Sequence, residues 1–131
     1  MYLLDANILG DLARNPDGAA AQAMKKVASE KIATSIIVCC EVEFGLVLKK
    51  SQKLRNRMDA IFGELEVLDF GSPAHQRYGA LRAHLREEGT PIGPNDLFIA
   101  AHALALDAVL VTDNEREFSR VPGLKIENWL R

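Results

Sequence analysis

The chain has 131 residues, of which 48% are hydrophobic and 26% are charged, and its formal net charge is −2. This length and apolar content predict one domain with a substantial core, and the acidic balance excludes the permanently basic surface of a dedicated nucleic-acid binder. No run approaches the roughly 20 apolar residues of a membrane span and no secretory leader is evident, so we expect a cytosolic protein. The two cysteines, Cys39 and Cys40, are adjacent, which suits neither an ordinary disulfide nor a zinc site and indicates a reducing compartment.

Apolar runs with strand character alternate with helical patterns along the chain. In chain order, the predicted elements are strand 2–4, helix 8–14, helix 18–28, strand 31–34, helix 36–49, helix 52–62, strand 66–70, helix 73–89, helix 94–106, strand 108–112 and strand 125–127. Strands that alternate with helices at this spacing predict an α/β fold, in which helices cover both faces of a short parallel sheet.

Polar residues and prolines mark several of the predicted helix starts. Asp17 is a candidate cap for the second helix, and Ser35 is a candidate cap for the third. The pair Ser72-Pro73 suits the cap and first turn of the helix that ends near residue 89, and Pro94 or Asn95 opens the helix that follows. These residues indicate where the predicted helices begin.

Three acidic residues lie at such junctions. Asp5 follows the first strand, Asp113 follows strand 108–112, and Asp96 lies at the start of helix 94–106. Because ligands of an open parallel sheet bind beyond the carboxyl ends of its strands, we expect Asp5 and Asp113 at the same edge. The helix dipole favours a carboxylate at Asp96, whose side chain can project from the first turn.

Glu41 is a fourth acid of a different kind, because it lies within the apolar segment Ile36-Ile37-Val38-Cys39-Cys40-Glu41-Val42. Burial of a carboxylate without a partner costs several kcal/mol, or raises its pKa until it is neutral. We therefore expect a partner for Glu41, and a cation shared with the other acids would serve.

Carboxylates gathered from distant segments repel one another unless a cation lies between them. Hard divalent cations prefer oxygen ligands, and Mg²⁺ typically binds one or two carboxylates together with water and substrate phosphate. Such a metal polarises a phosphoryl oxygen and lowers the pKa of bound water. The pattern therefore indicates phosphodiester hydrolysis that needs no nucleophilic side chain.

Longer motifs surround these acids. They are Asp5-Ala-Asn7-Ile, Glu41-Val-Glu-Phe-Gly45, Pro91-Ile-Gly-Pro-Asn-Asp96-Leu-Phe-Ile-Ala-Ala-His-Ala, and the segment from Leu110-Val-Thr112-Asp-Asn to Trp129. Together they resemble the PIN-domain ribonucleases of the VapC toxin family, and the likeness covers essentially the whole chain. The C-terminal half is highly specific, whereas the first motif alone is a weak indicator.

The resemblance implies one PIN domain over residues 1–131 and a Mg²⁺-dependent endoribonuclease, with Mn²⁺ as an alternative cofactor. It also implies the toxin of a bacterial toxin–antitoxin pair, inhibited by a VapB-type antitoxin. A homodimer and an RNA substrate, with tRNA as the expected class, follow from the same likeness.

The family's first three acids match Asp5, Glu41 and Asp96, which the resemblance makes catalytic metal ligands. Asn7 matches the Asn of the usual Asp-Thr-Asn, in which the Thr is replaced here by Ala6; this removes a hydroxyl group but no metal ligand. Thr112 matches the Thr of the last motif, and we expect it near substrate or ligands together with Asn7 and Asn114.

The fourth acid is ambiguous in the sequence. Many PIN domains carry it two residues after the Thr that matches Thr112, and Asn114 holds that position here. We favour Asp113 as the fourth catalytic and metal-binding acid because it directly leaves the strand. Glu117 is the alternative, although from a helix we expect its side chain to point elsewhere. The sequence therefore leaves open whether one or two metals bind.

Each candidate also has an ordinary structural explanation. Asp5 and Asp96 suit helix caps, and Asp113 suits a turn, although capping and metal binding are compatible. A solvated helix residue is the alternative for Glu41, but Glu43 is better placed for that role because it lies on a different face.

Other polar and special residues are expected to be structural. Gly45 is expected to permit close helix packing, Trp129 to anchor the C-terminus in the core, and the histidines to share no ligand set because their spacing is irregular (His75, His84 and His102). The basic residues between positions 49 and 57 suit a solvated helical face, or contacts with RNA phosphates or antitoxin carboxylates (Lys49, Lys50, Lys53, Arg55 and Arg57).

Two other functions compete with a nuclease. A PIN-like module that holds RNA or an antitoxin without cutting is supported by Ala6 and Asn114, the two departures from the family pattern. A phosphatase or response-regulator receiver is disfavoured, because Asp5-Ala-Asn7 lacks the paired acid that either would need.

Overall fold

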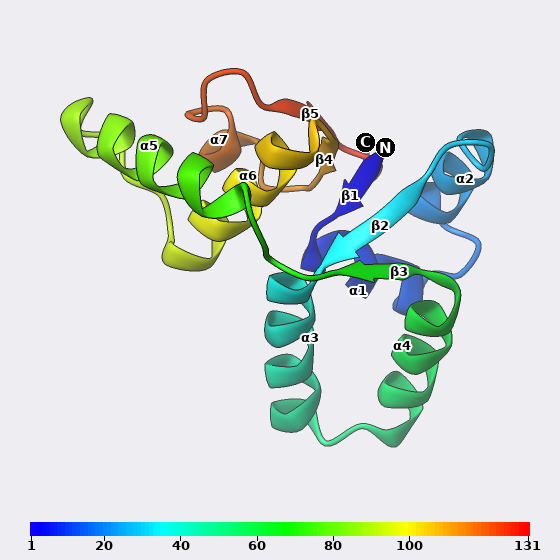
Figure 1. The fold of residues 1–131 in the computed structure, drawn as a ribbon. Helices are drawn as coiled ribbons and strands as arrows, with labels where there is room; N and C mark the ends of the chain where they lie inside the picture. The colour runs from blue at the N-terminus through cyan, green and yellow to red at the C-terminus, as the bar shows by residue number, and fades with distance from the viewer.

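Five short strands form one parallel sheet in the computed structural model, which describes residues 1–131. The strands are β1 (Tyr2–Leu4), β2 (Ile32–Ser35), β3 (Glu66–Leu68), β4 (Val109–Val111) and β5 (Lys125–Glu127). They lie in the order β3-β2-β1-β4-β5, so β1 is central (Figure 1). In the register, Leu4 lies opposite both Thr34 and Val111. The predicted parallel sheet is confirmed, and the carboxyl ends of β1, β2 and β4 meet at one edge.

Seven helices connect and flank these strands. They are α1 (Ala6–Arg14), α2 (Ala19–Lys26), α3 (Ile36–Lys49), α4 (Gln52–Glu64), α5 (Ala74–Glu87), α6 (Pro94–Leu106) and α7 (Glu115–Phe118). α1 packs against α2, α3 and α4, whereas α5 packs along α6. Figure 1 shows α3 and α4 as an antiparallel pair that extends away from the sheet. None of the helices has both the length and the apolar character needed to cross a membrane.

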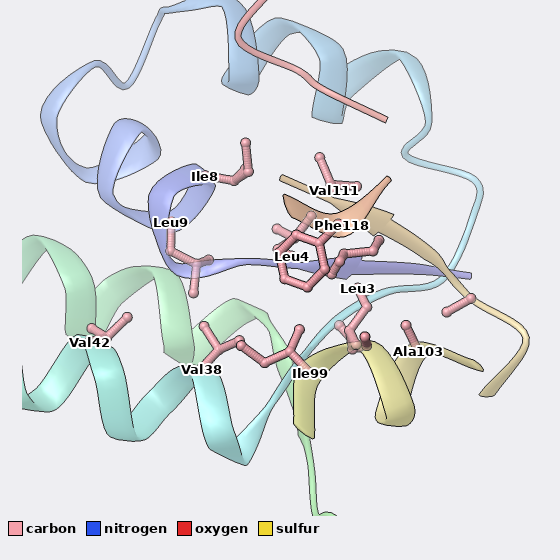
Figure 2. Close-up of a cluster of buried hydrophobic side chains, with 14 of the residues drawn as sticks. Leu3, Leu4, Ile8, Leu9, Val38, Val42, Ile99, Ala103, Val111 and Phe118 are labelled. Atoms are coloured by element: carbon pink, nitrogen blue, oxygen red, sulfur yellow. The ribbon is translucent and has the colours of Figure 1, made fainter. Parts of the chain in front are cut away.

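The core is built around the central strand. Leu3 and Leu4 of β1 are both fully buried, as expected for a strand covered on both faces. Figure 2 shows α1 on one side of this strand and α6 on the other, so that Ile8 and Ile99 approach it from opposite faces. Burial of these side chains holds the start of α1 and the start of α6 against the sheet, and both segments carry candidate site residues.

Local capping explains where several helices begin. Ser35 caps α3 as predicted, because its hydroxyl accepts a hydrogen bond from the backbone N–H of Ile37 at 3.1 Å. α1 begins two residues earlier than predicted because Asp5 accepts from the N–H of Ala6. The prediction that Asp17 caps α2 is wrong: Gly18 holds that position without a side-chain bond.

The segment after β4 differs most from the sequence-based prediction. A four-residue helix, α7, follows the turn at residues 113 and 114; Glu117 was expected to be helical, but the sequence indicated no bounds for a helix here. Its length is below that which apolar periodicity can reveal. Ser72 also makes no capping bond, and α5 starts after Pro73. The short helix α7 matters for the site, because it determines where Glu117 lies.

Gly45 does not serve the close helix packing that we expected. A Cβ atom built at this position meets no other atom within 4 Å. Because glycine destabilises a helix interior, we expect Gly45→Ala to raise the free energy of unfolding by about 0.5–1 kcal/mol in urea titrations. Gly79→Ala in α5 is the matched control, since that position is equally open. A destabilised Gly45→Ala protein beside a stabilised Gly79→Ala protein would contradict the open environment of Gly45.

Candidate active site

Asp5 is the buried centre of the site. It directly follows β1 and its side chain is only 4% exposed. One carboxylate oxygen accepts the backbone N–H of Ala6 at 2.8 Å, and the other accepts the hydroxyl of Thr112, also at 2.8 Å. Burial raises the pKa of Asp5, these two hydrogen bonds oppose the shift, and the charge of Glu117 adds to it. The carboxylate is thus both a helix cap and a fixed, desolvated oxygen donor.

Thr112 joins the two loops at this edge of the sheet. Its hydroxyl oxygen, which donates to Asp5, accepts from the backbone N–H of Asn114 at 3.0 Å and lies 3.4 Å from the amide nitrogen of Asn7. The Asn7 side-chain oxygen accepts the N–H of Asp113 at 3.0 Å. Thr112 therefore contacts Asp5 directly, and Asn7 and Asn114 adjoin Thr112.

Glu41 approaches Asp5 from α3. One of its carboxylate oxygens, Oε1, is buried and has no hydrogen-bond partner. Burial raises the pKa of Glu41, the charge of Asp5 raises it further, and the nearby Asn95 amide opposes the shift. The structure thus places Glu41 beside Asp5, and its buried, unpartnered carboxylate oxygen suits coordination of a cation.

Asp96 lies in the first turn of α6 and faces the same acids. Burial is the largest cause that raises its pKa to about 8, followed by the hydrogen bond and charge of Glu117 and then by the charges of Asp5 and Glu41. The pKa of Glu117 is lowered, chiefly by its hydrogen bond with Asp96. The two carboxyl groups therefore oppose each other's ionisation, which raises the pKa of Asp96 while that of Glu117 is lowered.

Glu117, and not Asp113, is the fourth acid at this point. Its Oε1 accepts the backbone N–H of Gly93 at 2.6 Å, and its Oε2 accepts the Asn114 amide at 2.8 Å. These bonds fasten α7 to the loop before α6, so Glu117 points at Asp96. The expectation that a helical Glu117 points elsewhere is wrong. The sequence did contain a signal for this position: Glu117 lies three residues after Asn114, and residues three apart share a helix face.

Asp113 points toward the C-terminus of the chain. Its carboxylate is exposed, accepts from the Asn128 amide at 3.0 Å and lies 3.7 Å from Nε of Arg131. It is not among the charges that shift the pKa of Asp5, Glu41 or Asp96. Because successive side chains of an extended segment alternate in direction, the inward hydroxyl of Thr112 leaves Asp113 facing outward.

The histidines and Trp129 lie where a structural role was expected. His102 is buried and its Nδ1 lies 2.8 Å from the Ser35 hydroxyl, while His75 and His84 are exposed on α5. Trp129 is 6% exposed and packs against Tyr2, with ring centroids 5.4 Å apart. None of these side chains joins the acids.

The carboxylate oxygens of these acids are the donor type that a hard divalent cation prefers, but they are not yet arranged as a coordination site. No group of three or more His, Cys, Asp or Glu side chains is arranged so that it could hold an ion as it stands. The unpartnered oxygen of Glu41 and the raised pKa of Asp96 nevertheless both indicate excess negative charge at one point. A cation bound by these oxygens would relieve both.

This charge arrangement predicts how the stability of the metal-free protein depends on pH. The pKa of Asp96 is raised from 3.8 to about 8, so between these values the folded chain holds a proton that the unfolded chain has lost, and stability falls as pH rises. Burial also lowers the pKa of His102, and this shift makes stability rise with pH. That effect is confined to pH values below 6.5, the ordinary pKa of histidine. We expect the melting temperature in EDTA to fall by about 3 °C between pH 6.5 and 8.5.

Differential scanning fluorimetry measures this fall directly. The Asp96→Asn protein, which has no proton to lose at this position, should show a flatter curve over the same pH range. Equally steep curves for the two proteins would contradict the raised pKa of Asp96.

Known proteins share this fold and these motifs over nearly the whole chain. The PIN domain model matches residues 2–124. Ribonuclease VapC2 of Rickettsia felis is 38% identical over 98% of both chains, and the tRNA(fMet)-specific endonuclease VapC of Shigella flexneri is 33% identical over 98% of this chain and 97% of its own. The crystal structure of the R. felis VapBC2 complex with promoter DNA contains a chain that superposes with a TM-score of 0.89, at 36% identity and 98% coverage of both. In sequence and in fold, the chain belongs to the VapC branch of the PIN-domain family.

Proposed function

We propose that this protein is a metal-dependent endoribonuclease that acts as the toxin of a type II toxin–antitoxin pair. The observation that carries the proposal is the meeting of Asp5, Glu41, Asp96 and Glu117, from four separate segments, at the carboxyl edge of the sheet. Their electrostatic coupling is seen in the raised pKa of Asp96. Repulsion within such a cluster costs stability in the metal-free protein, and strongly shifted pKa values of this kind are typical of functional sites.

The residues that would hold Mg²⁺, or Mn²⁺ in its place, are Asp5, Glu41, Asp96 and Glu117. When bound, the metal would polarise a phosphoryl oxygen of RNA and lower the pKa of a bound water. Thr112 and the Ala6 N–H hold the two oxygens of Asp5 in fixed directions. Asn114 orients Glu117 through its amide, and metal binding would favour the ionised form of Asp96 and Glu117.

The partners proposed here are a VapB-type antitoxin, tRNA and a second copy of the chain, and the place of action is the cytoplasm. Relatives support the first two, since one is named as a tRNA(fMet)-specific endonuclease and VapBC complexes are among the similar structures. The surface of α3 supports protein partners, because Phe44, Val47 and Leu48 are 67%, 58% and 64% exposed. Apolar side chains gathered in this way commonly mark an interface.

The experiment is to incubate the purified chain with total bacterial RNA in Mg²⁺ and, in parallel, in EDTA, and then to map new 5′ ends. Cleavage at a few positions, lost in EDTA, is the expected result. Cleavage that persists in EDTA would contradict the metal-dependent reaction, and the absence of new ends would contradict the nuclease.

The alternative function is a PIN-like module that binds RNA or an antitoxin without cutting. It draws on the absence of three acids already arranged around an ion and on Ala6 and Asn114, where the family pattern is not matched. Growth inhibition provides the test: if Asp5→Ala, Glu41→Gln and Asp96→Asn proteins inhibit growth as strongly as the parent, the binding module is correct.

A further inference from the structure

A groove leaves the acidic cluster between α3 and α4, with α1 as its floor. It has a volume of about 160 Å³, and its lining includes Gly10 and Arg14 of α1 and Glu41, Gly45 and Lys49 of α3. Glu41 also belongs to the acidic cluster, so the groove opens directly from the site. A strand cut at the acids would have this groove as one path away from them.

Two glycines shape the groove. A Cβ atom at Gly45 would meet nothing within 4 Å, so this position leaves open space between the helices. A Cβ atom at Gly10 would lie 3.0 Å from Nη1 of Arg14. The Arg14 side chain therefore extends toward the N-terminal end of α1 and lies over Gly10. Its positive charge is thereby closer to the acidic cluster than its backbone position at the end of the helix suggests.

Both cations of the groove lack an intramolecular partner. Arg14 and Lys49 take part in none of the ion pairs of the chain, which involve Lys31, Arg55, Lys125 and Arg131. Arg55, from the same basic segment as Lys49, is bound to Glu43 at 2.9 Å, and Arg57 is directed to the carbonyl of Ala13. The structure thus leaves one arginine and one lysine of the groove free to bind an anion.

We propose that Arg14 and Lys49 bind backbone phosphates of the RNA strand next to the position of cleavage. This inference rests on the proposed nuclease function. The eight residues from Glu41 to Lys49 span about 12 Å of helix, so Lys49 lies at the end of the groove away from the acidic cluster. Glu41 is the only carboxylate of the groove lining, and it lies at the end next to the acidic cluster. The other charged residues of the lining, Arg14 and Lys49, are positive, as in grooves that bind a single-stranded backbone.

The test measures binding of fluorescently labelled bulk tRNA by anisotropy in EDTA, where no cleavage occurs, from 50 to 200 mM KCl. The Arg14→Ala, Lys49→Ala double variant should bind about tenfold more weakly, and the slope of log affinity against log salt should fall by about 1 for each residue removed. The control is the Arg77→Ala, Lys26→Ala double variant, which removes two exposed helix cations outside the groove. This control should keep the salt slope of the wild type.

Gly45→Leu provides a second variant that changes no charge. It should fill the groove and weaken binding of the tRNA while the salt slope stays near that of the wild type. Circular dichroism of each variant separates these effects from loss of folding.

The outcomes distinguish this inference from the nuclease proposal. If the wild type cleaves RNA in Mg²⁺ but the Arg14→Ala, Lys49→Ala protein keeps its affinity and salt slope, the phosphate path is wrong. If the variant binds less RNA but the wild type never cleaves, the phosphate path stands and the nuclease proposal fails. If the substitutions weaken only a complex with a VapB-type protein, the groove is a protein-docking site and the inference is overturned.

Discussion

Asp96→Asn should lower the rate of RNA cleavage by about 10²- to 10³-fold, the loss typical of removing one preorganised electrostatic group. Burial is the largest cause of the raised pKa of Asp96, and Glu117, Asp5 and Glu41 each raise it further, so three other acids of the site act on this residue. The amide has nearly the same shape but cannot act as an anionic oxygen ligand. Single-turnover cleavage of the mapped RNA at saturating Mg²⁺ is the measurement.

The same substitution should make the metal-free protein more stable. At pH 7.5 the wild type must take up a proton at Asp96 on folding, which costs stability, whereas the amide needs none, and we expect a melting temperature about 3 °C higher in EDTA. The pair of measurements separates chemistry from folding. A variant that loses both activity and stability would contradict the proposed role of Asp96, because the defect would then lie in the fold.

Glu117→Gln should also reduce cleavage strongly, by about a hundredfold, while Asp113→Asn should reduce it by less than about threefold. Glu117 accepts from Gly93 and Asn114, and its hydrogen bond with Asp96 lowers its pKa. Asp113 instead faces Asn128 and Arg131. The two substitutions are matched in chemistry and differ by four positions, so their comparison tests which acid completes the site.

The direction of the difference decides the assignment. If Asp113→Asn is the damaging change and Glu117→Gln is tolerated, the side-chain arrangement after β4 must change before catalysis and the assignment of the fourth acid reverts to Asp113. The metal dependence of each variant gives an independent reading: Glu117→Gln should need more Mg²⁺ for half-maximal rate, and Asp113→Asn should not.

The sheet and three of the acids could be predicted from the sequence because each depends on local signals. The strand at residues 2–4 is a short apolar run, and the acid that follows it must lie at the carboxyl edge of a parallel sheet. Ser35 gave the start of α3, and the position of Glu41 in an apolar helix indicated that it needed a partner. These inferences need only chain periodicity and the chemistry of single residues.

The fourth acid could not be predicted in this way, because its position depends on contacts between segments distant in sequence. α7 has only four residues, and the bond from the Gly93 N–H to Glu117 joins residues 24 positions apart. Gly45 was misread for the same reason: a helical glycine in sequence does not reveal whether its open side meets another helix or a groove. Asp17 does not cap α2, because the helix begins one residue later than predicted and Gly18 occupies the N-cap position.

The exposed apolar side chains of α3 affect how the isolated chain should be handled. Phe44 and Leu48 are separated by one helical turn and present their hydrocarbon surface to solvent together. If a second copy covers them, dilution will uncover them again, because mass action governs such contacts. Assays at nanomolar and micromolar protein would then sample different association states, so sedimentation should be recorded at the concentration used for each rate.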